Sequence, residues 1–345
     1  MSTFPTRKIG GVNVSAIGYG AMGIAGAYSA LLPDEDRFKL LDATYAAGCT
    51  MWDTADLYGD SEELLGRWFQ RTGKRDDIFL ATKFGIVGRT PGQRIVNGSK
   101  EYARAAIEKS LKRLGVDYVD LYYLHRADIN VPIEESVGAM AEFVKEGKVK
   151  FLGLSEVSSA TLRRAHAVHP IAAVQVEYSP FTLDIEDPKI GLLETCRELG
   201  VAVIAYSPLG RGLLTGQYAR KSPDDFEPND FRRKVERYNA QNFPNILKIV
   251  DGLKEVGKHY SGATPGQVAL AWLLAQGEDI IPIPGTTKLK YLEENLGATK
   301  IKLSKEDEAK VRELAVVADA QQGERYPPGF QETLFVDTPL PGSTA

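Results

Sequence analysis

Residues 119–155 read VDLYYLHRADINVPIEESVGAMAEFVKEGKVKFLGLS. A β-branched and apolar run opens this stretch, an amphipathic segment follows it to Gly147, and a second apolar run begins at Val149. Short apolar runs that alternate with longer amphipathic segments are typical of parallel strands joined by helices. A glycine at the junction suits the left-handed turn that ends such a helix.

The same alternation extends over most of the 345-residue chain. Eight runs read as strands, each followed by a helical stretch: Ser15–Gly20, Thr50–Thr54, Ile78–Lys83, Val119–His125, Val149–Ser155, Ala173–Glu177, Ala202–Ser207 and Ile280–Pro284. Eight such units predict an α/β fold, the eight-stranded TIM (β/α) barrel, which commonly uses about 250 residues as one domain. We therefore expect a single domain over residues 1–345, with a core at about 7–318 and a C-terminal tail at 319–345.

Additions to the eight units are expected in the second half of the chain. Residues 211–244 form a polar stretch too long for an ordinary loop, which indicates an excursion after the seventh strand. Helical patterns over Asn245–Tyr260 and Thr264–Gln276 precede the eighth strand, and another over Ser304–Asp319 follows it. The tail from Gln321 lacks periodicity, so that it either packs over the barrel mouth or remains loose.

Composition and charge narrow the class of function. The chain has 42 Lys and Arg against 46 Asp and Glu, a formal net charge of −4 without a polybasic run, which argues against nucleic acid and anionic membranes as partners. No apolar run approaches the ~18 residues of a membrane span, and the first residues lack the apolar part of a signal peptide. Cys49 and Cys196 stand far apart, without the spacing of a disulfide framework or a zinc site. We expect a cytoplasmic monomer that acts on a small molecule and holds no metal.

A glycine motif follows the first strand. Residues Gly18 to Gly23 match the G-x-G-x-x-G fingerprint of dinucleotide-binding Rossmann folds. That fingerprint opens directly into a helix, whereas here the sequence continues as a loop to Pro33. We interpret the glycines as positions at which the backbone approaches a ligand closely.

Ionisable side chains collect where the second, third and fourth strands end. In a β/α barrel the carboxyl ends of the strands face the active site, and these ends carry Asp53, Tyr58, Lys83 and His125. Reducing a carbonyl requires a hydride at carbon and a proton at oxygen, and a tyrosine of pKa ~10 donates poorly near neutral pH unless its phenolate is stabilised. We expect Lys83 to stabilise the Tyr58 phenolate, Asp53 to keep Lys83 charged, and His125 to donate a hydrogen bond to the substrate oxygen.

These four residues resemble the catalytic tetrad of the aldo-keto reductase superfamily. The resemblance covers about residues 7–318, and the hallmark segments follow in order: Trp52–Gly59, Ala205–Gly210 and Ile283–Lys288. The phrases around Gly153 and Gln175 most resemble the monomeric NADP-dependent reductases of fungi, plants and bacteria, a branch that includes pyridoxal reductases and auxin-induced-protein-like enzymes. The resemblance implies the barrel with extra helices and an N-terminal β-hairpin.

It also implies NADPH/NADP+ as cofactor. The expected cofactor-binding residues are Ser155, Gln175, Tyr206, Ser207, Pro208, Leu209, Gly210, Gly285, Thr286, Thr287, Lys288, Glu294 and Asn295. Tyr206 is expected to stack on nicotinamide, the turn after it to bind the pyrophosphate, and Lys288 to contact the 2′-phosphate. The family's Ser-Asn pair is here Ser155-Glu156, and no role is assigned to Glu156 because a carboxylate cannot donate as asparagine does.

The leading hypothesis is therefore an NADPH-dependent reduction of aldehydes and ketones to alcohols, with pyridoxal as one candidate substrate. One alternative is a non-catalytic, nucleotide-binding regulatory subunit that resembles the potassium-channel β-subunits. Another is a phosphosugar isomerase on a barrel, which would use a glutamate base and need no Tyr-Lys pair.

Overall fold

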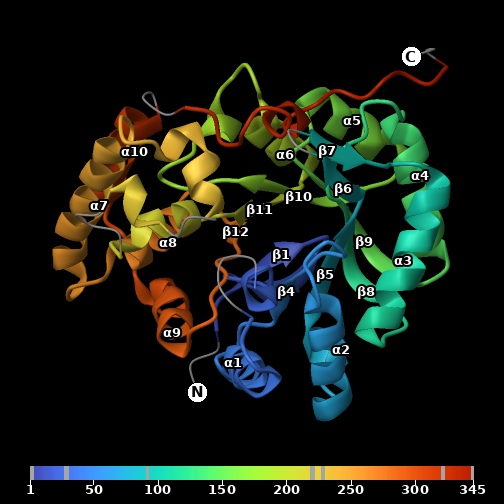
Figure 1. Cartoon of the computed structure of the whole chain (residues 1–345), viewed down its shortest axis with the longest axis horizontal. Helices are drawn as coiled ribbons and strands as arrows, with labels where there is room; N and C mark the ends of the chain where they lie inside the picture. The colour runs from blue at the N-terminus through green and yellow to red at the C-terminus, as the bar shows by residue number, and fades with distance from the viewer. Residues whose placement is uncertain are drawn as a thin grey trace.

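Eight parallel strands form the centre of the protein, and helices surround them (Figure 1). The computed structural model describes residues 4–26, 31–90, 93–217, 222–226, 230–319 and 323–342. The strands lie in the order β3 (Tyr19–Gly20), β4 (Met51–Asp53), β5 (Phe79–Phe84), β8 (Val119–Leu124), β9 (Val149–Ser155), β10 (Ile171–Glu177), β11 (Ala202–Tyr206) and β12 (Ile280–Pro282). The eight predicted runs correspond to these strands in chain order, which confirms the predicted barrel.

The barrel closes between its first and last strands. The amide of Gly18 donates to the carbonyl of Pro282 at 2.9 Å, and the amide of Gly20 donates to that of Pro284 at 3.4 Å. A Cβ on Gly20 would lie 2.7 Å from the Ile283 carbonyl oxygen. Gly20 therefore allows the protein's own backbone to approach, while the close approach of this motif to a ligand stays a prediction.

A hairpin covers the amino-terminal end of the barrel. Its strands are β1 (Thr6–Ile9) and β2 (Val12–Ser15), and they pair antiparallel. Ile9 and Val14 belong to the same apolar cluster as side chains from inside the barrel. This confirms the expected N-terminal hairpin; Ser15 belongs to it, and the first barrel strand is Tyr19–Gly20, shorter than the predicted Ser15–Gly20.

The helices form the outer layer. They are α1 (Asp34–Ala46), α2 (Ser61–Thr72), α3 (Lys100–Leu114), α4 (Ile133–Lys145), α5 (Ser159–Val168), α6 (Leu192–Leu199), α7 (Phe243–Gly257), α8 (Pro265–Ala275), α9 (Leu289–Gly297) and α10 (Lys305–Asp319). Helix α3 begins as its sequence indicates, because the Ser99 hydroxyl accepts from the Tyr102 amide, and it ends at Gly115 with φ 62°. Apolar side chains of the helices and strands pack into one large core between the two layers.

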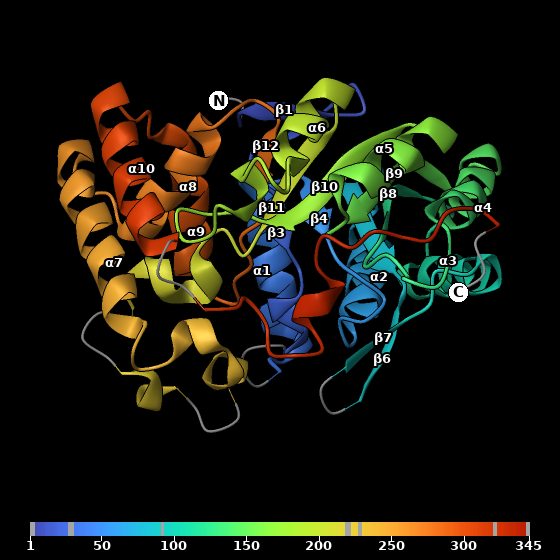
Figure 2. The same cartoon turned by 90° about the horizontal axis from the view of Figure 1, so that it is seen from above.

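The predicted additions are present. Helices α7 and α8 lie between β11 and β12 and α10 follows α9, as the helical patterns indicate, and α7, α8, α9 and α10 gather at one end of the molecule (Figure 2). The excursion after β11 contains short 3₁₀ turns, the first at Gly210–Thr215 and the last at Glu236–Tyr238. Residues 218–221 and 227–229 of this excursion lie outside the described residues. A hairpin that the sequence reading missed, β6 (Ile86–Thr90) with β7 (Gln93–Val96), follows β5.

The described part of the C-terminal segment, residues 323–342, runs across the barrel mouth (Figure 2). Of the two expectations for the tail, packing over the mouth therefore holds for these residues, and a loose tail does not. The amide of Phe335 donates to the Glu156 carbonyl at 2.8 Å, and Val336 forms a parallel bridge with Val157 directly after β9. Further along, the Thr338 hydroxyl accepts from the amide of Ile133 at the start of α4. The ends of the tail prediction, residues 320–322 and 343–345, lie outside the described residues.

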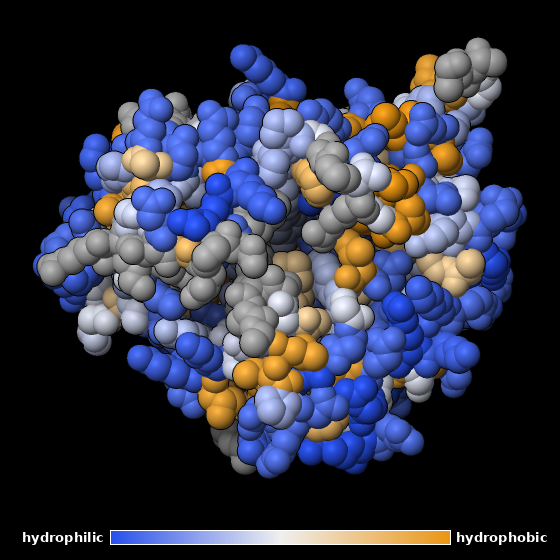
Figure 3. Space-filling model, in the orientation of Figure 1, coloured by the Kyte–Doolittle hydropathy of each residue, from blue (hydrophilic) through white to orange (hydrophobic). Residues whose placement is uncertain are grey.

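The surface is consistent with a chain in which a quarter of the residues are charged. The face drawn in Figure 3 is mostly hydrophilic, its apolar side chains fall in separate patches, and a hollow lies near its centre. Within the described residues, no helix combines the length and apolar character needed to cross a membrane.

Candidate active site

Four predicted side chains meet at the carboxyl end of the barrel. Asp53 is the last residue of β4, Lys83 lies near the end of β5, and His125 directly follows β8. Tyr58 stands in the loop between β4 and α2. The three strands are neighbours in the sheet, so their ends bring these side chains together at one edge, as predicted.

The ammonium group of Lys83 is the centre of this cluster. Its Nζ lies 2.5 Å from Asp53 Oδ1, donates to the Thr54 carbonyl at 2.8 Å, and lies 3.4 Å from the hydroxyl oxygen of Tyr58. The side chain of Lys83 is fully buried. The ring of His125 stands edge-on to that of Tyr58, with 5.8 Å between the ring centroids. One cation thus joins the carboxylate to the phenol.

Burial and pairing shift the proton affinities in opposite directions. Burial alone would lower the pKa of Lys83, but the carboxylate of Asp53 and the Tyr58 oxygen raise it above the ordinary lysine value. For Tyr58, burial raises the pKa, and the nearby Lys83 only partly opposes this. The net direction differs from our expectation of an acidified phenol. Lys83 therefore stays charged and Tyr58 stays protonated at neutral pH.

Two predicted cofactor residues lie next to this cluster, and one of them contacts it. The amide nitrogen of Gln175 donates to Asp53 Oδ2 at 2.7 Å, so that the second carboxylate oxygen is also held. The hydroxyl of Ser155 accepts from the guanidinium of Arg126 at 3.1 Å. Both side chains lie at the mouth next to the tetrad, at the ends of β9 and β10.

Glu156, to which the sequence assigned no role, is the centre of a buried charge network. Its Oε1 accepts from the Tyr206 hydroxyl at 2.7 Å, and its two oxygens accept from Arg325 at 3.1 and 2.9 Å. Tyr206 also lies 3.2 Å from the hydroxyl of Tyr326. The C-terminal segment therefore reaches the residue that we expect to stack on nicotinamide. No local pattern marks Arg325 or Tyr326, since their contacts depend on how the tail crosses the barrel.

The remaining predicted cofactor residues lie beyond the adjacent strands β11 and β12. Ser207, Pro208, Leu209 and Gly210 form a turn in which Ser207 and Gly210 have positive φ angles of 49° and 54°, and the Gly210 amide donates to the Ser207 carbonyl. Gly285, Thr286, Thr287 and Lys288 lead into α9, and Lys288 is its exposed N-cap residue.

Helix α8 stands between these two segments. A Cβ on its residue Gly266 would lie 3.6 Å from Leu209 and 3.5 Å from the Glu294 carboxylate, so the turn after β11 and helix α9 both face this one small residue. Glu294 itself accepts from the Thr264 hydroxyl at 2.6 Å, and the neighbouring Asn295 is buried. The structure thus brings the predicted cofactor residues of β11, β12 and α9 to one side of the mouth.

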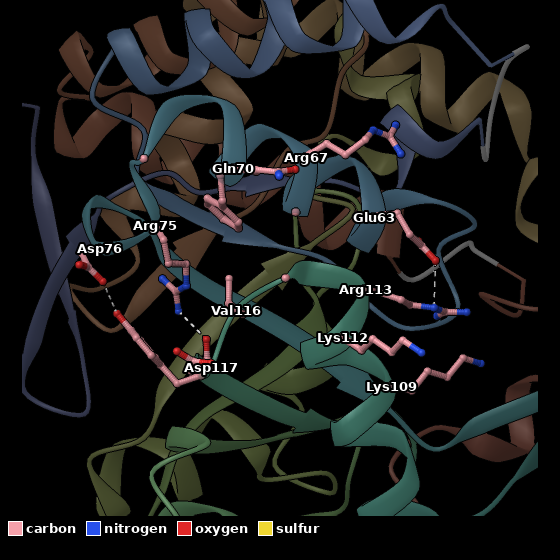
Figure 4. Close-up of a pocket in the computed structure, with 15 residues that line it drawn as sticks. Glu63, Arg67, Gln70, Arg75, Asp76, Lys109, Lys112, Arg113, Val116 and Asp117 are labelled. Atoms are coloured by element: carbon pink, nitrogen blue, oxygen red, sulfur yellow. Dashed lines mark hydrogen bonds and ion pairs between the residues drawn. The ribbon is translucent and has the colours of Figure 1, made fainter.

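A separate groove of about 1000 Å³ lies on the outer helix layer between α2 and α3 (Figure 4). Several of its cations are already paired: Arg75 lies 2.8 Å from Asp120, and Arg113 lies 3.0 Å from Glu63. The Tyr118 hydroxyl donates to Asp76 across the same groove. None of the four tetrad residues lines it, so it is not the predicted site.

Comparisons with known proteins agree with this architecture. The model of the aldo/keto reductase family matches residues 16–316. The chain is 65% identical over 316 residues to aldo-keto reductase str7 of Strobilurus tenacellus, covering 90% of this chain and 92% of that protein. It is 49% identical over 344 residues to aldo-keto reductase yakc [NADP(+)] of Schizosaccharomyces pombe, covering 98% of each. The protein therefore belongs to the aldo/keto reductase family, a family of oxidoreductases.

Solved structures show the same fold. The glycerol dehydrogenase AKR11B4 from Gluconobacter oxydans superposes with a TM-score of 0.82 at 26% identity, covering 93% of this chain and 98% of that one. An aldo-keto reductase from Klebsiella pneumoniae in complex with NADPH superposes with a TM-score of 0.69 at 25% identity, covering 97% and 99% of the two chains.

Proposed function

We propose that the protein reduces aldehydes and ketones to alcohols with NADPH, and that Tyr58 donates the proton. The observation that carries the proposal is the buried Lys83 ammonium, which lies 2.5 Å from Asp53 and 3.4 Å from the Tyr58 hydroxyl at the carboxyl end of the barrel. The yakc relative is named for NADP(+), and the Klebsiella structure contains NADPH. Both support the choice of cofactor.

The residues that would hold the cofactor fit it chemically. The turn from Ser207 to Gly210 follows β11 and has positive φ angles at Ser207 and Gly210, and turns of this kind can orient backbone amides toward a pyrophosphate. Lys288 is exposed at the amino end of the nine-residue helix α9, and it forms no ion pair with the described residues, so its charge is available to a 2′-phosphate. When bound, the nicotinamide supplies the hydride that goes to the carbonyl carbon.

The chain's own residues account for the proton. Burial keeps Tyr58 protonated, so its hydroxyl can donate to the carbonyl oxygen as charge develops there. Lys83 then stabilises the phenolate that remains, and Asp53 keeps the lysine charged within the buried mouth. His125, edge-on to Tyr58, is placed to hold the carbonyl oxygen, and solvent returns the proton to the phenolate.

The Tyr58→Phe variant tests this assignment. It removes the hydroxyl and leaves the ring, so we expect turnover of 4-nitrobenzaldehyde to fall by about 10²–10⁴-fold while the NADPH dissociation constant stays the same. Tyr45→Phe is the matched control, because the Tyr45 hydroxyl donates to Asp77 on the outer layer. Turnover that survives in Tyr58→Phe would require another acid. A wild-type protein that binds NADPH but reduces no carbonyl compound would instead favour the regulatory-subunit alternative.

Pyridoxal is the specific substrate that we propose to test first, because the sequence most resembles the branch that contains pyridoxal reductases. The organisation as one domain, the monomeric state and the cytoplasmic location stay predictions from the sequence.

A further inference from the structure

Arg126 is a buried cation beside the tetrad. It follows His125, its side chain is 3% exposed, and one guanidinium nitrogen donates to the His125 carbonyl at 2.6 Å and to Ser155 at 3.1 Å. Its Nε is buried without a hydrogen-bond partner among the described residues. A buried guanidinium with an unmet donor is costly unless a further acceptor reaches it.

Arg94, on β7, reaches the C-terminal segment from the β6–β7 hairpin. Its guanidinium lies over the ring of Tyr326 at 4.6 Å and that of Phe330 at 5.0 Å, and it donates to the Thr333 hydroxyl at 3.1 Å. Burial lowers the pKa of Arg94, and the positive charge of Arg126 lowers it further. Contacts connect the two arginines: the Tyr326 ring under Arg94 has its hydroxyl 3.2 Å from that of Tyr206, and Tyr206 donates to Glu156, the residue directly after the Ser155 that Arg126 binds.

Arg94 and Arg126 differ from other arginines of the mouth, which form ion pairs with carboxylates. Arg325 is paired with Glu156 at 2.9 Å, and Arg211 with Glu177 at 3.2 Å. Within the described parts of the chain, neither Arg94 nor Arg126 has a carboxylate at ion-pair distance. Glu156 attracts Arg126 from farther away, but its oxygens are already bound by Arg325 and Tyr206.

Arg126 and Arg94 lie near the residues that we expect to act on the substrate and the cofactor. The charge of Arg126 reaches Tyr58, where it acts to lower the pKa of the phenol. Arg94 contacts Tyr326, whose hydroxyl lies 3.2 Å from that of Tyr206. Arg126 thus lies beside His125 and Ser155, and Arg94 lies one ring away from Tyr206, so an anion that contacts both would be bound at the barrel mouth near the tetrad.

We propose that Arg126 and Arg94 bind an anionic group, a carboxylate or a phosphate ester, on the carbonyl substrate. The inference rests on the proposed function, and it names the substrate class of that site. A guanidinium pair without a carboxylate matches a group that carries negative charge and several acceptor oxygens. The substrate would be an aldehyde or ketone whose anionic group is bound by the arginines while its carbonyl faces Tyr58.

The test compares substrates of similar shape and different charge. For each protein we would measure kcat/KM for 4-carboxybenzaldehyde and divide it by kcat/KM for 4-nitrobenzaldehyde. Pyridoxal 5′-phosphate and pyridoxal form a second pair, which separates a preference for phosphate from one for carboxylate. We expect the wild type to prefer the anionic member of at least one pair, and the ratio for that pair to fall about tenfold or more in Arg126→Gln.

Two further variants cover the case in which Arg126→Gln folds poorly. Arg94→Gln, in a half-buried position on the hairpin, should lower the same ratio, and Arg126→Lys should lower it less because the charge remains. The control is Arg71→Gln, since Arg71 pairs with Asp42 at the exposed surface, and its ratio should equal that of the wild type. Titration calorimetry with benzoate gives a readout that does not depend on turnover, and its affinity should fall about tenfold in Arg126→Gln.

Ratios and benzoate affinities that stay unchanged in both Arg126→Gln and Arg94→Gln would overturn the anion site, even if 4-nitrobenzaldehyde is reduced. An NADPH dissociation constant that rises by the same factor as the ratio falls would assign the arginines to a cofactor phosphate and would also overturn it. A wild type that reduces none of the four aldehydes overturns the proposed function itself, regardless of the benzoate affinity.

Discussion

The Arg325→Met variant tests how the C-terminal segment is held on the barrel mouth. Arg325 is 1% exposed and Glu156 is fully buried, so methionine would leave the Glu156 carboxylate charged, buried and without its main partner. Asp184 lies 2.7 Å from the Arg325 Nε, although it is not aligned for a hydrogen bond, and Glu177 lies at 3.9 Å. One substitution therefore removes the cation that several carboxylates share.

The structure sets the expected size of the effect. Arg325 donates two charge-assisted hydrogen bonds to Glu156, and such bonds contribute about 1.5–3 kcal/mol each. Breaking a buried ion pair by removing one partner costs about 3–5 kcal/mol, which agrees with that sum. A typical domain has only about 5–15 kcal/mol of stability, so the variant should lose a large fraction of it.

The assay is urea unfolding followed by circular dichroism, with a double-mutant cycle. Glu156→Gln combined with Arg325→Met removes both charges, and it should be more stable than Arg325→Met alone because no unpaired carboxylate remains. Arg71→Met is the control, since its pair with Asp42 is exposed and should contribute about 1 kcal/mol or less. A loss in Arg325→Met no larger than in this control would refute the reasoning.

Two further predictions concern pH and the cofactor. Burial, followed by the charge of Glu62, raises the pKa of Asp56 to about 7 from an ordinary 3.8, so its protonated form stabilises the fold below about pH 4 and that contribution is lost as the pH rises through 7. At pH 8 the free energy of unfolding of Asp56→Asn, measured with urea, should therefore exceed that of the wild type by up to about 4 kcal/mol, and this difference should shrink toward pH 4. A difference that stays constant with pH would contradict the shifted pKa. Lys288→Ala should weaken NADPH binding about tenfold while changing NADH binding little, as measured by fluorescence titration, and an equal loss for both would place the 2′-phosphate elsewhere.

The barrel could be predicted because its information is local. Each strand is a short apolar run, and each helix has its own periodicity and end signals. Because the strands are parallel, Asp53, Lys83 and His125 lie at the same edge of the sheet independently of the loop conformations. The fold class and the meeting of Asp53, Lys83 and His125 followed from these features, whereas Tyr58 lies in the loop between β4 and α2. The β6–β7 hairpin was missed because its two short strands carry no strong alternation of their own.

The contacts of the tail and the proton affinities could not be predicted in the same way. Arg325 meets Glu156 across 169 positions of sequence, and Arg94 meets Thr333 across 239, so no local pattern indicates either pair. The net pKa of Tyr58 depends on how deeply the closed mouth buries it, which the spacing to Lys83 does not reveal. Gly20 has its role because Ile283 follows the strand that closes the barrel, and this too is a long-range relation.

The central claim is that Tyr58, supported by the buried Lys83–Asp53 pair, donates the proton during carbonyl reduction. The most direct measurement is the single-turnover rate of NADPH oxidation by 4-nitrobenzaldehyde with NADPH already bound, in Tyr58→Phe beside Tyr45→Phe. We predict that the rate in Tyr58→Phe drops by at least about a hundredfold while Tyr45→Phe matches the wild type. Equal rates in the two variants would contradict the claim.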